Sequence, residues 1–439
     1  MTERIVLGGA LLAAADAPLQ MGWGVRIANG AVAQVAPNED LIRAGADLEA
    51  IDARDLILLP GFVNAHMHSY GLLAHGIPLT ESPAGFYPFL AEFWWPRVED
   101  RLDAAMVEAA FRLACVRMIR QGITTVCDVL EAPQAAPGAL DVEARVAEEV
   151  GIRAVLSLEA SERQGGDAGR AALAENVRFA AARRAGCITG MMSLHTSFSC
   201  SEAFVREGKR LAVESGLRTH LHLSESDHEP SFTLGRYGVR PVAWYDRFGF
   251  WDESIVASQG VALAADEIST LAARGVHLVH MPQSNCEVGG GVAPVPEMIA
   301  AGIRPGLGTD GYINDPFEVM RAAFLIHKGV RRDPLVLPAR TVLAMATAWG
   351  ADAVGVDAGA LRPGRRADLI GVRLDLDTPL APENVADQLV LFRTGTDVAL
   401  TIVDGRTLFR DGEFVTVDPD AARREAHGQA RRLWAEEGR

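Results

Sequence analysis

Two pairs of histidines in this sequence have the spacing of metal ligands. His66 and His68 form one pair, and His220 and His222 form the other. Alternate side chains of a β-strand point to the same face, so a His-x-His pair at a strand end can bind one ion. Two imidazoles are too few for a catalytic zinc site, which uses about three protein ligands and an open position. The missing ligands must come from elsewhere in the chain. His220, one pleat deeper than His222, is expected to pack in the core or support a ligand.

Two acidic residues lie at the ends of predicted strands and complete the candidate site. Glu225 follows the second histidine pair, and Asp310 ends the run Gly-Leu-Gly-Thr-Asp. Four residues would together offer one divalent ion three nitrogens and one oxygen: His66, His68, His222 and Asp310. Such an ion lowers the pKa of a bound water toward about 7 and makes hydroxide available at neutral pH. Glu225 is placed to take a proton from that water and pass it to a leaving nitrogen.

The middle of the chain must position these residues. Strand-like and helix-like segments alternate there, which predicts an α/β fold, a (β/α)8 TIM barrel, with its active site at the C-terminal ends of the strands. Eight segments are the predicted barrel strands: Leu58–His68, Thr124–Asp128, Arg153–Glu159, Thr189–His195, Arg218–Leu223, Ile255–Gln259, His277–Met281 and Ile303–Asp310. The main helices predicted between them are Ala104–Arg120, Asp141–Val150, Ala168–Ala185, Glu202–Ser215, Asp266–Arg274 and Pro316–Lys328.

A smaller β-domain is predicted from the two ends of the chain. Short apolar runs broken by turn residues precede the barrel, and similar runs with Asp-Gly turns return after it. This pattern is typical of antiparallel strands and predicts a small β-sandwich assembled from both ends. The predicted boundaries are 1–58 for the N-terminal part of the sandwich, 59–355 for the metal-dependent barrel, 356–419 for the C-terminal part, and 420–439 for a polar C-terminal helix.

The composition narrows the class of partner. The 439 residues carry 57 acidic and 42 basic side chains, a formal net charge of −15. This balance argues against a nucleic-acid-binding surface and favours a small-molecule substrate. The five cysteines are scattered without a C-x-x-C pair, which is typical of reduced thiols. With no secretory leader and no run of about 18 apolar residues, we expect a cytoplasmic protein without a membrane span.

Four motifs resemble those of a known enzyme family. They are Leu-Pro-Gly-Phe-Val-Asn-Ala-His-Met-His at 59–68, His-Leu-His-Leu-Ser-Glu at 220–225, His-Met-Pro-Gln-Ser-Asn at 280–285 and Gly-Leu-Gly-Thr-Asp-Gly at 306–311. Together they resemble the amidohydrolase superfamily, within it the aminohydrolase and chlorohydrolase branch of guanine, cytosine and adenosine-type deaminases and triazine hydrolases. Phe-Trp-Trp-Pro at 93–96 and Leu-His-Thr-Ser-Phe at 194–198 are most similar to the SsnA-type aminohydrolases, which have no secure substrate.

The resemblance implies a role for each of these residues. It implies metal ligation by the three histidines and Asp310 named above, with Glu225 as the proton shuttle. The family normally has a histidine at the end of the sixth strand, where this sequence has Gln259. A glutamine donates and accepts hydrogen bonds but carries no proton at neutral pH. Two interpretations stay open: the substrate needs only orientation at this position, or the protein is impaired and merely binds its ligand.

The resemblance also implies the metal content. Members with two ions bridge them by a carbamylated lysine on the fourth strand, and the segment Thr189–His195 has no lysine. We therefore predict one divalent ion, with zinc preferred and iron as the alternative. Dimers are usual among such proteins, so a homodimer is expected.

Further residues are predicted to contact the substrate: His195, His280, Trp94, Trp95 and Asp128. The two histidines end the fourth and seventh strands. His195 could instead make a structural hydrogen bond, and His280 could instead hold the turn Pro282–Asn285. Asp128, like Glu159 on the next strand, could recognise an amino or ring N–H group or be a solvated or helix-capping residue. The tryptophans end an aromatic insertion, residues 86–95, which could form a lid over a flat substrate or a dimer contact.

The sequence thus predicts hydrolysis of a carbon–nitrogen bond other than a peptide bond. The leading hypothesis is deamination of a small heterocyclic amine with release of ammonia. The alternatives are a hydrolase of the same fold that acts on an amide or halide, and a catalytically weak protein that binds metal and ligand. Gln259 is the residue that separates the last of these from the enzymes.

Overall fold

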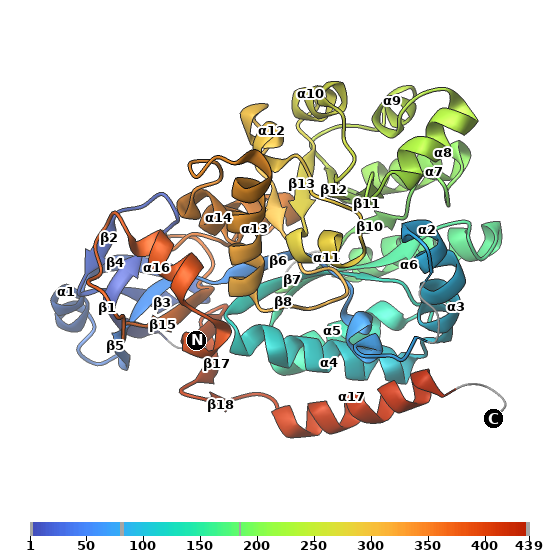
Figure 1. Ribbon diagram of the computed structural model, residues 1–439. Helices are drawn as coiled ribbons and strands as arrows, with labels where there is room; N and C mark the ends of the chain where they lie inside the picture. The colour runs from blue at the N-terminus through green and yellow to red at the C-terminus, as the bar shows by residue number, and fades with distance from the viewer. Residues whose placement is uncertain (1–2, 80–82, 184–185, 436–439) are drawn as a thin grey trace.

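The computed structural model describes residues 3–79, 83–183 and 186–435. Over these residues the chain forms two nine-stranded sheets. One is a parallel barrel from the middle of the chain, and the other is a mixed sheet built from both chain ends, which lies beside the barrel in Figure 1. The predicted fold class, a (β/α)8 barrel with a small β-domain from both termini, is confirmed.

The barrel strands follow one another around the sheet in the order β14-β13-β12-β11-β10-β8-β7-β6, with β9 paired to β8. An isolated parallel bridge between Met67 and Asp310 joins the two ends of this order, so metal-ligand segments lie at the closure. The strands are β6 (Phe62–Met67), β7 (Ile123–Leu130), β8 (Arg153–Ala160), β9 (Ile188–Gly190), β10 (Met192–Leu194), β11 (Thr219–Leu223), β12 (Ile255–Gln259), β13 (His277–His280) and β14 (Gly306–Leu307).

Helices surround the barrel, and its strands are buried on both faces. Every residue of β6 and of β7 is buried, as expected for parallel strands covered by helices. The helices are α4 (Ala104–Arg120), α5 (Ala139–Val150), α6 (Gly166–Ala182), α7 (Glu202–Ser215), α8 (His228–Tyr237), α9 (Pro241–Asp246), α10 (Ala265–Ala273), α11 (Pro282–Glu287), α12 (Val295–Ala300), α13 (Pro316–Arg331), α14 (Ala339–Met345) and α15 (Ala348–Val354).

The first, fourth and eighth predicted strands differ most from the observed ones. Leu58 and Leu59 pair with β15 of the mixed sheet, so the barrel strand begins only at Phe62. Gly61 lies between the two sheets, where a Cβ would stand 2.1 Å from Thr124 Oγ1, and only glycine allows that approach. The fourth predicted strand is split between β9 and β10, and the eighth is reduced to the two residues of β14. Residues 308–310 leave the ladder and approach the first strand instead.

The mixed sheet takes strands from both ends in the order β18-β17-β16-β15-β5-β1-β3-β4, with β2 paired to β1. Inward-facing residues of several of its strands form a hydrophobic cluster separate from that of the barrel. Its strands are β1 (Arg4–Leu12), β2 (Leu19–Met21), β3 (Trp23–Ala28), β4 (Ala31–Pro37), β5 (Glu49–Pro60), β15 (Leu369–Arg373), β16 (Val398–Val403), β17 (Arg406–Arg410) and β18 (Glu413–Phe414). Two helices accompany it in the sequence, α1 (Asn38–Ala44) and α16 (Val385–Phe392).

The C-terminal helix α17 (Pro419–Trp434) lies along α4 at the lower edge of Figure 1. Trp434 Nε1 donates a hydrogen bond of 2.7 Å to the carbonyl of Leu73, in the short helix η1 (Ser69–Ala74) that follows the first histidine pair. Residues 436–439 of the predicted helix lie outside the described residues.

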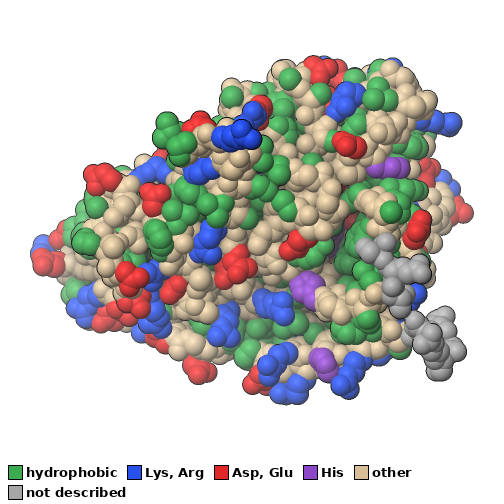
Figure 2. Space-filling model, viewed as in Figure 1, with side chains coloured by type: hydrophobic (Ala, Val, Ile, Leu, Met, Phe, Trp, Pro, Cys, Tyr) green, Lys and Arg blue, Asp and Glu red, His purple; other side chains and the backbone are tan. Residues whose placement is uncertain are grey.

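The face shown in Figure 2 mixes acidic, basic and apolar side chains, with basic side chains gathered over α17. Within the described ranges, no helix combines the length and hydropathy that a membrane span requires.

Candidate metal centre and active site

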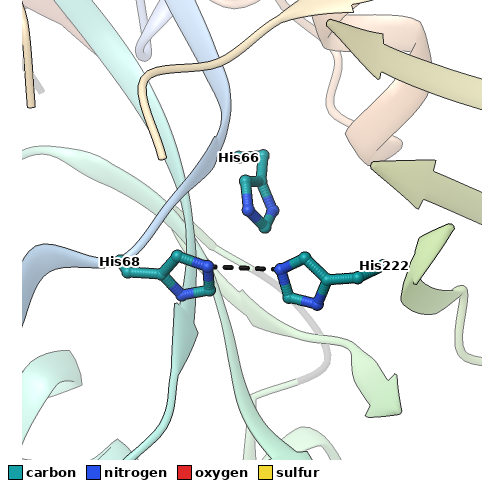
Figure 3. A group of neighbouring side chains, drawn as sticks. All are labelled: His66, His68 and His222. Carbon is teal, nitrogen blue, oxygen red and sulfur yellow. Dashed lines mark hydrogen bonds between the residues drawn. The ribbon is translucent and has the colours of Figure 1, made fainter. Parts of the chain in front are cut away.

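Three histidines converge at the C-terminal end of the barrel. His66 comes from β6, His68 follows that strand, and His222 comes from β11; one nitrogen of each lies within 4.8 Å of the others. Figure 3 shows the three rings turned toward a common point, with His68 Nε2 and His222 Nε2 3.3 Å apart. The structure therefore brings together the predicted histidine ligands.

Asp310 faces the same point from beyond β14. Its Oδ1 lies 3.3 Å from His68 Nε2 and 4.0 Å from His66 Nε2. Burial alone would raise the pKa of this carboxyl, but the neighbouring histidines and the Ser284 hydroxyl lower it to about 2. Asp310 is therefore ionised and can offer an oxygen beside the three nitrogens.

The far sides of two rings face oxygen atoms, and at His68 the contact fixes which nitrogen is free. His68 Nδ1 lies 2.7 Å from the carbonyl oxygen of Val129. Because a carbonyl can only accept a hydrogen bond, Nδ1 carries the hydrogen and Nε2 keeps its lone pair. His222 Nδ1 lies 3.1 Å from Glu159 Oε2. A carboxylate or carbonyl behind a ligating histidine is the usual arrangement around bound metals, because it sets the tautomer and the ring direction.

His66 provides the test of whether a metal fits. Its side chain is fully buried, and neither ring nitrogen has a hydrogen-bond partner among the described residues. Burial lowers the pKa of His66 well below its ordinary value, so the ring is neutral. A buried polar atom without a partner is costly, and a divalent ion facing Nε2 would remove that cost. Three imidazoles and one carboxylate suit zinc.

Glu225 lies beside this group and lines the same cavity. Burial, followed by the charges of Asp310 and other carboxylates, raises the pKa of Glu225 well above its ordinary value. A carboxyl that holds a proton near neutral pH is suited to proton transfer. The glycine-rich turn at 289–291 packs against it: a Cβ on Gly290 would lie 2.6 Å from the Glu225 carbonyl oxygen.

Gln259, the departure from the family pattern, lies behind Asp310. Its Nε2 donates a 2.8 Å hydrogen bond to Asp310 Oδ2, and it is not among the described residues that line the cavity.

Three residues at or just beyond the ends of barrel strands β11, β12 and β14 have left-handed backbone conformations. Ser224, Gln259 and Asp310 have φ values of 49°, 76° and 57°. Such conformations cost about 1–3 kcal/mol each for residues other than glycine and cluster at functional sites. They turn the chain at the strand ends and so direct the side chains across the barrel.

The cavity above these residues has a volume of about 370 Å³, within the range of small-molecule sites. The predicted insertion forms much of its wall as three short helical segments, α2 (Phe86–Pro88), η2 (Phe89–Trp94) and α3 (Trp95–Arg97). The aromatic residues that line the cavity are Tyr70, Phe86, Phe89, Phe93, Trp94, Trp95 and Tyr312. None of the described lining residues is a lysine or arginine.

The predicted substrate contacts divide into two groups. Trp94, Trp95 and His195 line the cavity, and burial lowers the pKa of His195 to about 3, so its ring is neutral. Asp128 and His280 are not among the described lining residues. Asp128 accepts a hydrogen bond from the backbone N–H of Ser69.

His280 points away from the cavity lining. Its Nε2 lies 3.2 Å from His327 Nε2 of α13, and both side chains are buried. The ring of His280 thus contacts α13, a partner that neither of the two predicted roles included.

Two carboxylates in the cavity wall were not predicted. Glu131 lies just past β7, and Glu99 begins the short helix η3 (Glu99–Arg101) after the aromatic insertion. Strand β7 extends to Leu130, two residues beyond its predicted end. The acidic residue that emerges at the strand end is therefore Glu131 rather than Asp128, and the longer apolar run through Val129 and Leu130 was the available signal.

Comparisons with known proteins agree with this geometry. Residues 57–408 match the model of the Amidohydrolase family. The chain is 35% identical over 385 residues to a 5-methylthioadenosine/S-adenosylhomocysteine deaminase of Moorella thermoacetica, with 84% of this chain and 86% of the relative covered. It is also 35% identical over 398 residues to a 5'-deoxyadenosine deaminase of Methanosarcina mazei, with 88% of each chain covered.

A solved structure shares the whole architecture. An adenosine deaminase from Xanthomonas campestris with bound zinc aligns with a TM-score of 0.88 and 25% identity over 98% of both chains. The family match covers most of the sequence and includes both histidine pairs, Glu225 and Asp310. This chain belongs to the amidohydrolase family.

Proposed function

We propose that this protein is a zinc-dependent aminohydrolase that removes the amino group of an adenine nucleoside and releases ammonia. One observation carries the proposal: three histidines and Asp310 surround one point, with Glu225, whose pKa is raised by burial, beside it at the floor of an aromatic cavity. The relatives described above, which are named as deaminases, support the reaction, and the zinc-bound structural neighbour supports the metal.

The chain's own residues divide the work. His66, His68, His222 and Asp310 would hold the ion, which when bound supplies an activated water and an electrophilic centre. Glu225 takes up a proton and delivers it to the leaving nitrogen, a role that its pKa, raised by burial and by the nearby carboxylates, favours. The neutral ring of His195 can orient a polar group of the substrate by hydrogen bonding.

The cavity wall favours a flat and uncharged substrate. Trp94 and Trp95 are among the aromatic rings that can cover a planar base. Because no described lining residue is lysine or arginine, a phosphate or carboxylate on the substrate would find no basic partner in the wall. We therefore expect 5'-deoxyadenosine or 5'-methylthioadenosine to be preferred to adenosine monophosphate.

The test is ammonia release by the zinc-reconstituted protein with adenine nucleosides, guanine, pterins and triazines. Deamination of an adenine nucleoside, and its loss after chelation, would support the proposal. A protein that binds no zinc, or that binds zinc and releases no ammonia from any of these compounds, would refute it. Release of halide from a chlorotriazine without ammonia would identify a different hydrolase.

Two further expectations accompany the proposal. The sequence predicts a homodimer, which light scattering of the purified protein would test, and a cytoplasmic location, which fractionation of cells of the source organism would test.

A further inference from the structure

A short row of hydrogen-bonding side chains lies behind Asp310, on the side away from the histidines. Gln259 Nε2 and Ser284 Oγ each donate to Asp310 Oδ2 at 2.8 Å. Asn285 Nδ2 in turn donates to Gln259 Oε1. Gln259, Ser284 and Asn285 are at most 2% exposed. One oxygen of Asp310 is thus occupied by two donors, while Oδ1 faces the histidines.

Only one orientation of the Gln259 amide satisfies these contacts. The ionised Asp310 can only accept hydrogen bonds, so the amide must direct Nε2 toward it. Gln259 Oε1 then faces Asn285, whose Nδ2 is a donor. If the amide flipped, it would bring two oxygens together at Asp310 and two N–H groups together at Asn285. Asp310 therefore sets the direction of the amide, and Asn285 holds the other end of that amide by donating to Oε1.

The backbone supports the same conclusion. Gln259 and Asp310 both have positive φ, at 76° and 57°, a conformation that costs free energy for residues other than glycine. At Gln259 it turns the chain at the end of β12, where the side chain reaches across to the end of β14. A strained backbone conformation persists only where surrounding contacts hold it. At Gln259 these contacts are the hydrogen bonds to Asp310 and from Asn285.

We propose that Asn285 and Gln259 are positioning residues that hold Asp310 as a one-oxygen metal ligand. Gln259 is then an adaptation of this chain and not a sign of lost activity. The inference rests on the metal site of the proposed function, but it concerns the affinity for the ion and not the reaction. With two side-chain donors at Oδ2, the oxygen of Asp310 that faces the histidines is Oδ1, which accepts one hydrogen bond, from Gly311 N at 2.9 Å, and keeps a lone pair for the ion. Outer contacts of this kind typically change metal affinity by about 10-fold to 100-fold.

The test is the zinc affinity of the Asn285→Asp variant, measured by competition with a chromogenic chelator on the full chain. Aspartate has the same size but presents only acceptors to Gln259 Oε1, so it repels the amide oxygen or reverses the amide. We expect the zinc dissociation constant to rise about 10-fold or more. A matched control is Asn176→Asp, since Asn176 is also fully buried but is hydrogen-bonded to the backbone of Leu158 in β8. This control should lower thermal stability without weakening zinc binding.

A double-mutant cycle separates positioning from a general structural effect. If Asn285 acts through Gln259, adding Asn285→Asp to a Gln259→Leu variant should not weaken zinc binding further. Equal weakening in both backgrounds, or an Asn285→Asp variant that binds zinc as tightly as the parent, would overturn the inference. Failure of the parent to bind zinc at all would instead refute the proposed function, so the two failures are distinguishable.

Discussion

Glu229 is the residue for which the structure makes the sharpest mutational prediction. It lies in the first turn of α8 and is 2% exposed. Its Oε1 accepts hydrogen bonds from Ser197 N at 3.1 Å and Ser197 Oγ at 2.5 Å, and its Oε2 accepts one from Ser224 N at 2.6 Å. Glu229 therefore ties the loop that follows His195 to the peptide that precedes Glu225.

The Glu229→Gln substitution keeps the size of the side chain and removes one acceptor. The amide nitrogen must face either the Ser224 N–H or the Ser197 donors, so at least one buried donor loses its partner. A hydrogen bond to a charged group contributes about 1.5–3 kcal/mol, and we expect the free energy of unfolding to fall by about 2 kcal/mol. Displacement of the Ser224–Glu225 peptide by about 1 Å would lower kcat on the order of 100-fold, while KM changes less.

Glu267→Gln is the matched control for this experiment. Glu267 is 3% exposed and accepts hydrogen bonds from Val242 N at 3.1 Å and Ala264 N at 3.0 Å, but it does not line the cavity formed by the described residues. Urea unfolding and ammonia-release kinetics should show a similar loss of stability in both variants and a loss of kcat only in Glu229→Gln. An unchanged kcat in Glu229→Gln, with the stability loss present, would contradict the assigned role.

Three further predictions concern single side chains. Glu225→Gln should lower kcat by about 100-fold to 10,000-fold with zinc content unchanged by elemental analysis; a fully active variant would remove Glu225 from the mechanism. Glu159→Gln should weaken zinc binding about 10-fold or more in chelator competition, because it alters the group that faces His222 Nδ1. An unchanged zinc affinity would show that Glu159 does not support the His222 ring. Asp103→Ala should lower the free energy of unfolding by about 1 kcal/mol, because Asp103 caps α4 and pairs with Arg432. Partial burial raises the pKa of Asp103, but these partners have the larger combined effect and lower it. The loss of unfolding free energy in Asp103→Ala should therefore be full above about pH 4 and shrink as the pH falls below it. A loss that is independent of pH would contradict this account.

The barrel and the ligands were predictable because their signals are local and periodic. Helices α4 and α7 begin and end at their predicted residues, and strand β12 does so as well. The alternation of strand and helix required ligand-type residues at strand ends, and the His-x-His spacing required two rings on one face of a strand. Those constraints hold whatever the detailed packing, so they could be recognised in the sequence.

The cavity wall was harder to predict because it depends on where each strand ends and how the chain turns there. A two-residue error at the end of β7 exchanged Glu131 for Asp128. His280 ends β13 as predicted, yet its ring packs on His327 of a helix far along the chain. The alternation of strand-like and helix-like segments predicts neither where a strand ends nor which side chains pack beside it.

The position of Gln259 bears on whether this site is maintained or decaying. A residue left over from a lost activity has no need of exact partners, and its backbone can relax. Gln259 instead keeps a positive φ and is bound at both ends of its amide, to Asp310 and from Asn285. Retaining such a conformation costs about 1–3 kcal/mol, which the two hydrogen bonds to buried polar groups can offset. This balance favours a maintained site, in which Gln259 orients Asp310 as the proposed metal ligand and the proposed proton transfer is assigned to Glu225.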